Sequence, residues 1–277
     1  MMNKTEIINS GKYKFKITTN IQLYEDRITC HTYKVGGDYA DCINISYKYK
    51  NNIPVKAMIP HLLYEPECAV GMFLERGSGT ELMIKTAILY AYNHVKSIPL
   101  FEFEDDSNID CVEKNMKLEV PRKLTKPLNL AFYHIAYHGT TWYEARFNAK
   151  MIDSEKFKRY RKSLEFLTDP GQKPEFKFFL EIIENKHAKD SPQLKMLEKY
   201  YNKGVTYRKF FEAIPKDDRC DILYEWLETF MKYYIDYDNK NWYIDARKMN
   251  SDTLQSGGSL SKKLSYYIFS YKKTSNF

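Results

Sequence analysis

The chain lacks any uninterrupted apolar run that approaches the length of a bilayer span, and Met1–Glu6 contain no apolar segment typical of signal peptides. We therefore expect a soluble, intracellular, cytoplasmic protein with no membrane contact. Cysteine is also scarce: the five cysteines are far apart, with no Cys-x-x-Cys pair and no histidine pair at ligand spacing nearby. They are Cys30, Cys42, Cys68, Cys111 and Cys220. This spacing predicts reduced thiols, with neither a disulfide framework nor a structural zinc.

Several catalytic signatures are missing as well. The sequence has no Gly-x-x-x-x-Gly-Lys-(Ser/Thr) phosphate loop, no kinase motif set, no Gly-x-Ser-x-Gly elbow and no cysteine with a recognisable histidine partner. These absences argue against an NTPase, a kinase or a hydrolase. His134 and His138 could share a helical face and bind a metal, but no glutamate follows in the metalloprotease pattern. We expect no metal.

The sequence does contain enough apolar residues for a sizeable core, since 43% of its residues are hydrophobic. Its length of 277 residues predicts one large domain or two modest ones. The net charge of +7 is concentrated at residues 239–277, where aromatic and basic residues alternate. This segment predicts either a weak contact with nucleic acid or a solvated strand pair. The abundance of tyrosine, lysine, asparagine and isoleucine is typical of low-GC genomes, including those of large DNA viruses; a viral protein would act in the host cytoplasm.

Alternating apolar residues predict short strands over 13–20, 28–35, 42–49 and 54–64. In the third of these, Ile43, Ile45 and Tyr47 fall on one face and polar residues on the other. Asn51-Asn52 fits a hairpin turn, because asparagine tolerates left-handed backbone angles. An antiparallel meander is therefore expected.

A glycine-bearing turn, Leu74–Met83, follows this meander and leads into an amphipathic helix over 81–95 and a further strand over 99–105. A strand, loop, helix, strand unit places its two strands parallel and its loop at their carboxyl ends, where ligands bind. Glycine amides and the helix dipole favour an anion there. The alternative is an ordinary turn capped by Ser78 or Thr80.

The second half changes character. Thr140 or Thr141 can cap a short helix, with Glu144 closing a capping box. Helical patterns then follow one another over 176–183, 194–201 and 222–233, and strand-like runs return over 241–249 and 264–271. We predict an α/β fold with a mixed sheet and a helical insertion or C-terminal helical subdomain. The expected parts are an α/β core over 1–152, a helical block over 153–238, and a strand pair over 239–277 that rejoins the core.

Two short motifs resemble those of the GNAT-type N-acetyltransferases. Arg76-Gly77-Ser78-Gly79 is similar to the family's (Gln/Arg)-x-x-Gly-x-(Gly/Ala) coenzyme A loop, and Trp142–Phe147 is similar to its aromatic-Tyr-Glu helix. The resemblance covers about residues 40–150 and implies a GNAT-like fold. It also implies that acetyl-CoA or another acyl-CoA binds at Arg76, Gly77, Ser78, Gly79 and Thr80. Tyr143 would protonate the thiolate, with Tyr133 and Tyr137 as competing candidates.

The same resemblance implies acyl transfer to an amine of a protein or small molecule by direct attack. His61, Glu65 and Glu102, near strand ends, are candidates for the base that accepts the amine's proton. The sequence departs from the family pattern at Glu81, where Gly or Ala is expected, and at Arg146, where Gly is expected. A carboxylate repels a pyrophosphate. The alternative is a non-catalytic interaction module that binds a protein through 153–238 or nucleic acid through 239–277.

Overall fold

The computed structural model describes residues 2–24, 27–112, 125–185 and 191–249. Contacts between residues divide the chain into two compact units, Met1–Glu104 with Tyr243–Phe277, and Asp105–Trp242. The boundaries expected after residues 152 and 238 mark where the helical patterns of the sequence begin and end. The boundaries of the two units, by contrast, mark where contacts between residues are few. Within the described part of the chain, no helix combines the length and apolar character that a membrane crossing requires.

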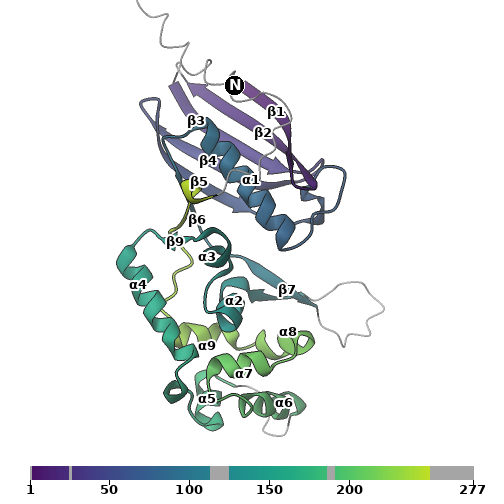
Figure 1. Cartoon of the computed structure of the whole chain (residues 1–277), viewed down its shortest axis with the longest axis vertical. Helices are drawn as coiled ribbons and strands as arrows, with labels where there is room; N and C mark the ends of the chain where they lie inside the picture. The colour runs from purple at the N-terminus through teal and green to yellow at the C-terminus, as the bar shows by residue number, and fades with distance from the viewer. Residues whose placement is uncertain (1, 25–26, 113–124, 186–190, 250–277) are drawn as a thin grey trace, which may run out of the picture. The chain divides into compact units, whose positions relative to one another are not determined.

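The first unit is built on a mixed sheet (Figure 1) whose strand order is β1-β2-β3-β4-β5-β6-β10. Its first part is an antiparallel meander, and β6 then joins β5 in parallel, with Met58 opposite Glu102. The bounds are β1 (Met2–Ser10), β2 (Tyr13–Tyr24), β3 (Arg27–Gly36), β4 (Asp41–Lys50), β5 (Ile53–Leu62), β6 (Leu100–Phe103) and β10 (Trp242–Asp245). The meander and the parallel pair predicted from the sequence are thus confirmed.

One long helix, α1 (Ser78–His94), connects β5 to β6 and lies across one face of the sheet (Figure 1). Its apolar side buries Met83, Ile84 and Ile88. The strands that face α1 bury every second side chain against it, because successive side chains of a strand point to opposite faces. On β4 the buried residues include Ile43, Ile45 and Tyr47, which confirms the predicted alternation. The helix begins three residues earlier than expected, because the glycine turn itself is helical from Ser78.

The Asn51-Asn52 hairpin is also confirmed. Both residues have positive φ, 51° and 62°, and Lys50 pairs with Ile53 across the turn. Strand β1 was missed: its sequence, Met-Asn-Lys-Thr-Glu-Ile-Ile-Asn-Ser, shows no clear alternation. It pairs with β2 over its full length, Met2 opposite Ile21 and Ser10 opposite Tyr13, so backbone pairing rather than side-chain pattern defines it.

The prediction that all cysteines are reduced is wrong. Cys42 and Cys68 form a disulfide across a sequence separation of 26 residues. They meet because the chain after β5 returns to the start of β4, where the Leu63 amide donates to the Cys42 carbonyl at 2.7 Å. Cys220 is disulfide-bonded too, whereas Cys30 is free. Since disulfides persist mainly in oxidising compartments, the expected cytoplasmic location loses the support of reduced thiols.

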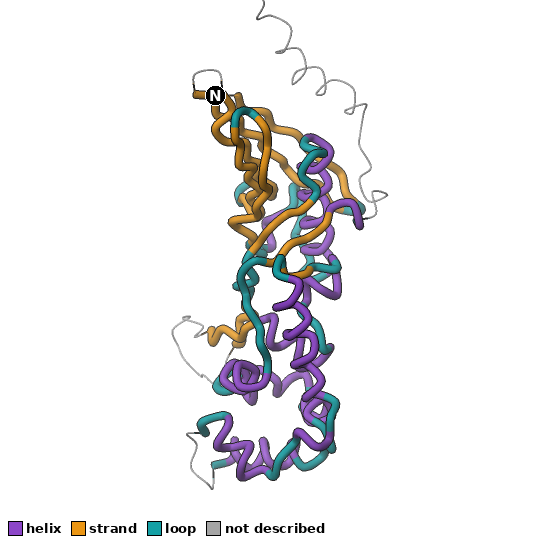
Figure 2. Tube along the Cα trace, turned by 90° about the vertical axis from the view of Figure 1, so that its left-hand side faces the viewer, coloured by secondary structure: helices purple, strands orange, loops and turns teal. Residues whose placement is uncertain are grey.

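The second unit is mainly helical, with one short antiparallel strand pair (Figure 2). Its strands are β7 (Asn108–Val112), β8 (Thr125–Asn129) and the two-residue β9 (Lys150–Met151). Its helices are α2 (Leu130–His138), α3 (Trp142–Phe147), α4 (Ser154–Ser163), α5 (Phe176–Ile182), α6 (Pro192–Tyr201), α7 (Tyr207–Ala213), α8 (Arg219–Leu223) and α9 (Leu227–Tyr234).

Aromatic rings form the centre of this second unit. Phe179 of α5, Phe210 of α7 and Phe230 of α9 are fully buried. The centroid of the Phe179 ring lies 5.6 Å from that of Phe210 and 5.7 Å from that of Phe230. Trp226 packs edge-on against Phe179 at 5.4 Å. The helices predicted around Phe176 and Leu194 are confirmed, but the pattern from Ile222 to Tyr233 is interrupted. Trp226 leaves helical geometry with φ −131°, which separates α8 from α9.

The strand expected over 241–249 is present as β10, followed by a 3-10 turn, Ala246–Lys248. The Ala246 amide donates to the Pro99 carbonyl at 2.9 Å, which places this turn beside the start of β6. The strand expected over 264–271, and with it most of the basic segment 239–277, lies outside the described residues. Its expected contact with nucleic acid stays a prediction.

Candidate functional site

The glycine turn lies where the sequence placed it, between β5 and the first turn of α1. Gly77 is the N-cap residue, with φ 87°, and neither Ser78 nor Thr80 supplies a side-chain cap. The Glu81 amide donates to the Gly77 carbonyl at 2.8 Å, which starts the helical ladder. Ser78 is exposed, whereas Gly79 and Thr80 are buried. Of the predicted loop residues, Arg76, Gly77 and Ser78 therefore face outward.

Gly79 is required for packing. A Cβ atom there would lie 2.9 Å from Leu74 Cδ1 and 3.1 Å from the Tyr13 hydroxyl. The Tyr13 hydroxyl accepts a hydrogen bond from the Glu75 amide at 3.3 Å, so the turn is attached to β2 at this point. The need for glycine at 79 thus follows from the fold itself.

Charged side chains flank the turn on both sides. Lys12 pairs with Glu75 and holds the pKa of that carboxyl below its usual value, and the Ser78 hydroxyl donates to Glu75 Oε2 at 3.4 Å. Glu81 pairs with Lys85 Nζ at 2.6 Å, one helical turn further on. Arg76 lies over the Tyr64 ring, 5.6 Å from its centroid. The turn therefore presents one guanidinium and two carboxylates that already have lysine partners.

The three base candidates lie on different parts of the first unit. Glu102 forms an ion pair with Lys56 on the neighbouring strand. Its neighbours Phe101 and Phe103 are buried on the α1 side, so Glu102 points to the opposite face of the sheet. His61 near the end of β5 and Glu65 just after it are both exposed.

Tyr143, the predicted acid, belongs to α3 in the second unit and is 4% exposed. Burial raises its pKa well above the usual value, as does the nearby charge of Asp105, so its hydroxyl stays protonated at neutral pH. The competing candidates differ: the Tyr133 hydroxyl accepts from Arg219 Nη1 at 3.1 Å, whereas the buried Tyr137 hydroxyl has no hydrogen-bond partner among the described residues.

A buried polar network lies around Tyr143 that the sequence did not indicate. Asp105, 2% exposed, accepts from the Ser107 hydroxyl at 2.6 Å and from the Tyr237 hydroxyl at 2.9 Å. Burial raises the pKa of Asp105, and the two hydroxyl donors oppose that shift. Nearby, the Tyr160 hydroxyl donates to Glu144 Oε2 at 2.6 Å. Residues far apart in sequence meet here, which is why pattern analysis could not find the network.

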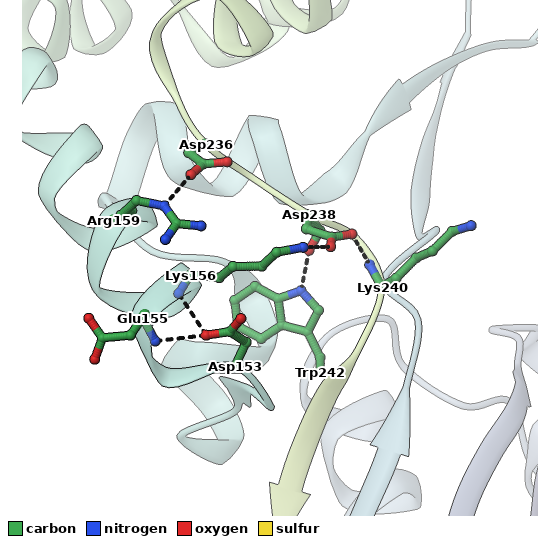
Figure 3. Close-up of polar contacts among 8 residues, drawn as sticks. All are labelled: Asp153, Glu155, Lys156, Arg159, Asp236, Asp238, Lys240 and Trp242. Carbon is green, nitrogen blue, oxygen red and sulfur yellow. Dashed lines mark hydrogen bonds and ion pairs between the residues drawn. The ribbon is translucent and has the colours of Figure 1, made fainter.

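The second unit also carries a small charged cleft of about 190 Å³, between the start of α4 and the chain before β10 (Figure 3). Lys156 Nζ pairs with Asp238 Oδ2 at 3.2 Å. Asp238 Oδ1 in turn accepts from the Lys240 amide at 2.9 Å. The remaining lining residues are Met151, Ile152, Asp153 and Asn241.

The carboxylates of this cleft, Asp153 and Asp238, bind neighbouring parts of the chain. Asp153 caps α4 by accepting from the Glu155 and Lys156 amides, at 2.9 Å and 3.0 Å (Figure 3). The Asp238 carbonyl accepts from Trp242 Nε1 at 2.6 Å. We interpret the cleft as a clamp that joins α4 to the chain before β10.

No protein-family model, no curated protein and no solved structure matches the chain. Among the described residues, no group of three or more His, Cys, Asp or Glu side chains is arranged to hold a metal ion.

Proposed function

We propose that the chain is a GNAT-like acyltransferase that transfers an acetyl or other acyl group from coenzyme A to an amine of a protein or small molecule. The observation that carries the proposal is the parallel β5–β6 pair in a sheet whose meander is antiparallel, with the Arg76–Thr80 turn at the start of the connecting helix. Ligands of α/β units bind at the carboxyl ends of such strands.

The outward-facing residues of the turn suit a phosphate group. The exposed start of α1 offers backbone amides and the positive end of the helix dipole, and Arg76 adds a cation. The bound thioester would supply the acyl carbon. Among the chain's own residues, His61, Glu65 or Glu102 would take the proton from the amine. Tyr143, predicted as the acid for the leaving thiolate, belongs to the other unit, and its role stays a prediction.

The second candidate is a non-catalytic interaction module with the same fold. It is favoured by Glu75, whose Oε2 lies 3.4 Å from the Ser78 hydroxyl and brings negative charge to the start of α1. Such a module would bind a protein through residues 153–238 or nucleic acid through 239–277.

A thermal-shift titration with acetyl-CoA tests the proposal, because a ligand that binds the native state raises the melting temperature. Ser78→Asp is the informative variant: a carboxylate in the first turn of a helix favours folding but repels a phosphate. Ser78→Asn is its uncharged control. Gly79→Asp is unsuitable, since its side chain would collide with Leu74 and Tyr13.

We expect acetyl-CoA to raise the melting temperature of the wild type and of Ser78→Asn, and to leave that of Ser78→Asp unchanged. An equal rise in all three proteins would place the cofactor elsewhere. No rise even at about 100 times a typical micromolar dissociation constant would reject the acyltransferase in favour of the interaction module.

A further inference from the structure

A groove of about 500 Å³ lies in the second unit between α5 and α9, the two helices labelled at the lower part of Figure 1. We call it the α5–α9 groove. Helix α5 contributes Phe178, Glu181 and Ile182 to its lining, and helix α9 contributes Tyr233 and Tyr234. The groove therefore brings three aromatic rings and a carboxylate together from two helices that are far apart in the sequence.

The two tyrosines of the groove are held in a fixed arrangement. The ring centroids of Tyr233 and Tyr234 lie 5.0 Å apart, and their planes are inclined at 73°. Tyr234 also stacks on Phe166, with 4.5 Å between centroids and 4° between planes. Its hydroxyl lies 2.8 Å from that of Tyr207. These contacts fix Tyr234 before any ligand arrives, so little ordering is needed on binding.

Two of the rings are open to solvent. Tyr233 is 67% exposed and Phe178 is 51% exposed, whereas Phe179, the next residue on α5, is fully buried in the core. Exposed apolar side chains are common singly, but their gathering in one place marks binding sites. The core of this unit is built without Phe178 and Tyr233, and both line the same groove.

The chemistry of the lining favours a cation. The face of an aromatic ring carries partial negative charge, which attracts a positive group placed over it. Glu181 follows Phe178 by three residues on α5 and so lies on the same side of the helix, where it adds a full negative charge. A quaternary ammonium group fits such a site well, because its methyl groups also pack against the rings.

Tyrosine rings already accept cations elsewhere in this unit. Lys173 Nζ lies 3.6 Å from the Tyr201 ring centroid, and the Arg219 guanidinium carbon lies 3.8 Å from that of Tyr137. Lys173 stands directly before Pro174, which lines the groove, yet its ammonium group is placed over a tyrosine of α6. The nearest lysine in the chain is therefore engaged by a different ring.

We propose that the α5–α9 groove binds a small organic cation that carries a quaternary ammonium group. The ammonium group would contact the rings of Tyr233, Tyr234 and Phe178, and the Glu181 carboxylate would balance its charge. The volume of the groove lies within the range of about 300 to 1,000 Å³ that is typical of small-ligand sites. This site uses no residue of the Arg76–Thr80 turn, so it is independent of the proposed acyl transfer.

Two probes of the same shape test the site. Choline carries the quaternary ammonium group, and 3,3-dimethylbutan-1-ol replaces it with an uncharged carbon. Titrations followed by saturation-transfer NMR give the dissociation constant of each, even where binding is weak. The informative variants are Tyr233→Leu, which removes a ring but keeps an apolar side chain, and Glu181→Gln, which removes only the charge.

Each variant has a matched control. Tyr39→Leu removes a tyrosine that is 95% exposed in the first unit. Glu184→Gln removes an exposed glutamate that follows α5 and does not line the groove. Circular dichroism verifies that every variant folds.

We expect the wild type to bind choline at least about tenfold more tightly than 3,3-dimethylbutan-1-ol. Tyr233→Leu and Glu181→Gln should each weaken choline binding about fivefold and change binding of the uncharged probe much less. The two control variants, and Ser78→Asp of the acyl-CoA turn, should bind choline as the wild type does. Equal affinities for the two probes would overturn the proposal, as would equal losses in Tyr233→Leu and Tyr39→Leu. The absence of choline binding at about 10 mM would overturn it too.

Discussion

His31 occupies an unusual position beneath α1. Its Nδ1 lies 3.1 Å from the Tyr49 hydroxyl, whereas its buried Nε2 has no hydrogen-bond partner among the residues that the structure describes. The rings of Tyr33 and Tyr47 lie against it, and within the described part of the chain neither of their buried hydroxyls has a hydrogen-bond partner. Burial lowers the pKa of His31 from 6.5 to about 4, and the charge of His94 acts in the same direction. The folded protein therefore holds this imidazole neutral.

This environment predicts an acid-sensitive first unit. Because the pKa of His31 is lower in the folded than in the unfolded chain, its contribution to stability is complete above pH 6.5 and is lost as the pH falls toward 4. The loss from this residue amounts to about 3 kcal/mol of unfolding free energy. Urea unfolding at a series of pH values measures it.

The His31→Phe variant, which cannot titrate, is the matched control. Its unfolding free energy should depend less on pH between 6.5 and 4 than that of the wild type. Equal slopes for the two proteins would show that His31 is not held neutral.

Helix α3 begins with a capping box whose members also bind other elements. The Thr141 hydroxyl accepts from the Glu144 amide at 3.1 Å, and Glu144 Oε2 accepts from the Thr141 amide at 2.8 Å. Glu144 Oε2 also accepts from Tyr160 of α4. The cap therefore fixes the start of α3 and its contact with α4.

We expect Thr141→Val to destabilise the second unit by about 1 to 2 kcal/mol, since it keeps the shape of the buried Thr141 side chain but removes the acceptor of the Glu144 amide. Thr140→Val, at the adjacent and less buried position, should cost much less. Denaturant midpoints of the two variants provide the comparison, and similar losses would contradict the cap.

Elements with a local signature could be predicted from the sequence. The box at Thr141 and Glu144, the hairpin at Asn51-Asn52 and the alternation of β4 each depend on residues within a few positions of one another. Strand β1 could not be predicted, because its apolar and polar side chains do not alternate and backbone pairing with β2 defines it. The break at Trp226 could not be predicted either, because the residue that packs against Trp226, Phe179, is distant in sequence.

The candidate sites differ in the same way, between residues adjacent in sequence and residues brought together by the fold. The Arg76–Thr80 turn is contiguous and could be located from the sequence, whereas the network at Asp105 combines residues that lie far apart in the sequence. The disulfide is the clearest case. Cysteine spacing alone indicated reduced thiols, and only the return of the chain to the start of β4 brings Cys42 to Cys68.

On the scale of the whole molecule, this disulfide predicts a measurable contribution to stability. Closing a loop over a separation of 26 residues lowers the entropy of the unfolded chain, which corresponds to about 3 to 4 kcal/mol. The Cys42→Ala/Cys68→Ala double variant should lose roughly this much in denaturant unfolding. Cys30→Ala, which removes a free thiol, is the control. Detection of both Cys42 and Cys68 as free thiols by mass spectrometry of the unreduced protein would contradict the prediction.

The distribution of aromatic residues between the two units has a spectroscopic consequence. All three tryptophans, Trp142, Trp226 and Trp242, lie between Asp105 and Trp242, whereas the Met1–Glu104 segment contains none. Trp242 begins β10, but its ring packs against Tyr160 and Tyr237 of the helical unit. Fluorescence excited selectively in tryptophan therefore reports on the aromatic packing of the helical unit. Trp226, enclosed by phenylalanine rings, should emit at short wavelength until that unit unfolds. Far-ultraviolet dichroism follows the sheet as well, so the difference between the two signals shows whether the units unfold together or in sequence.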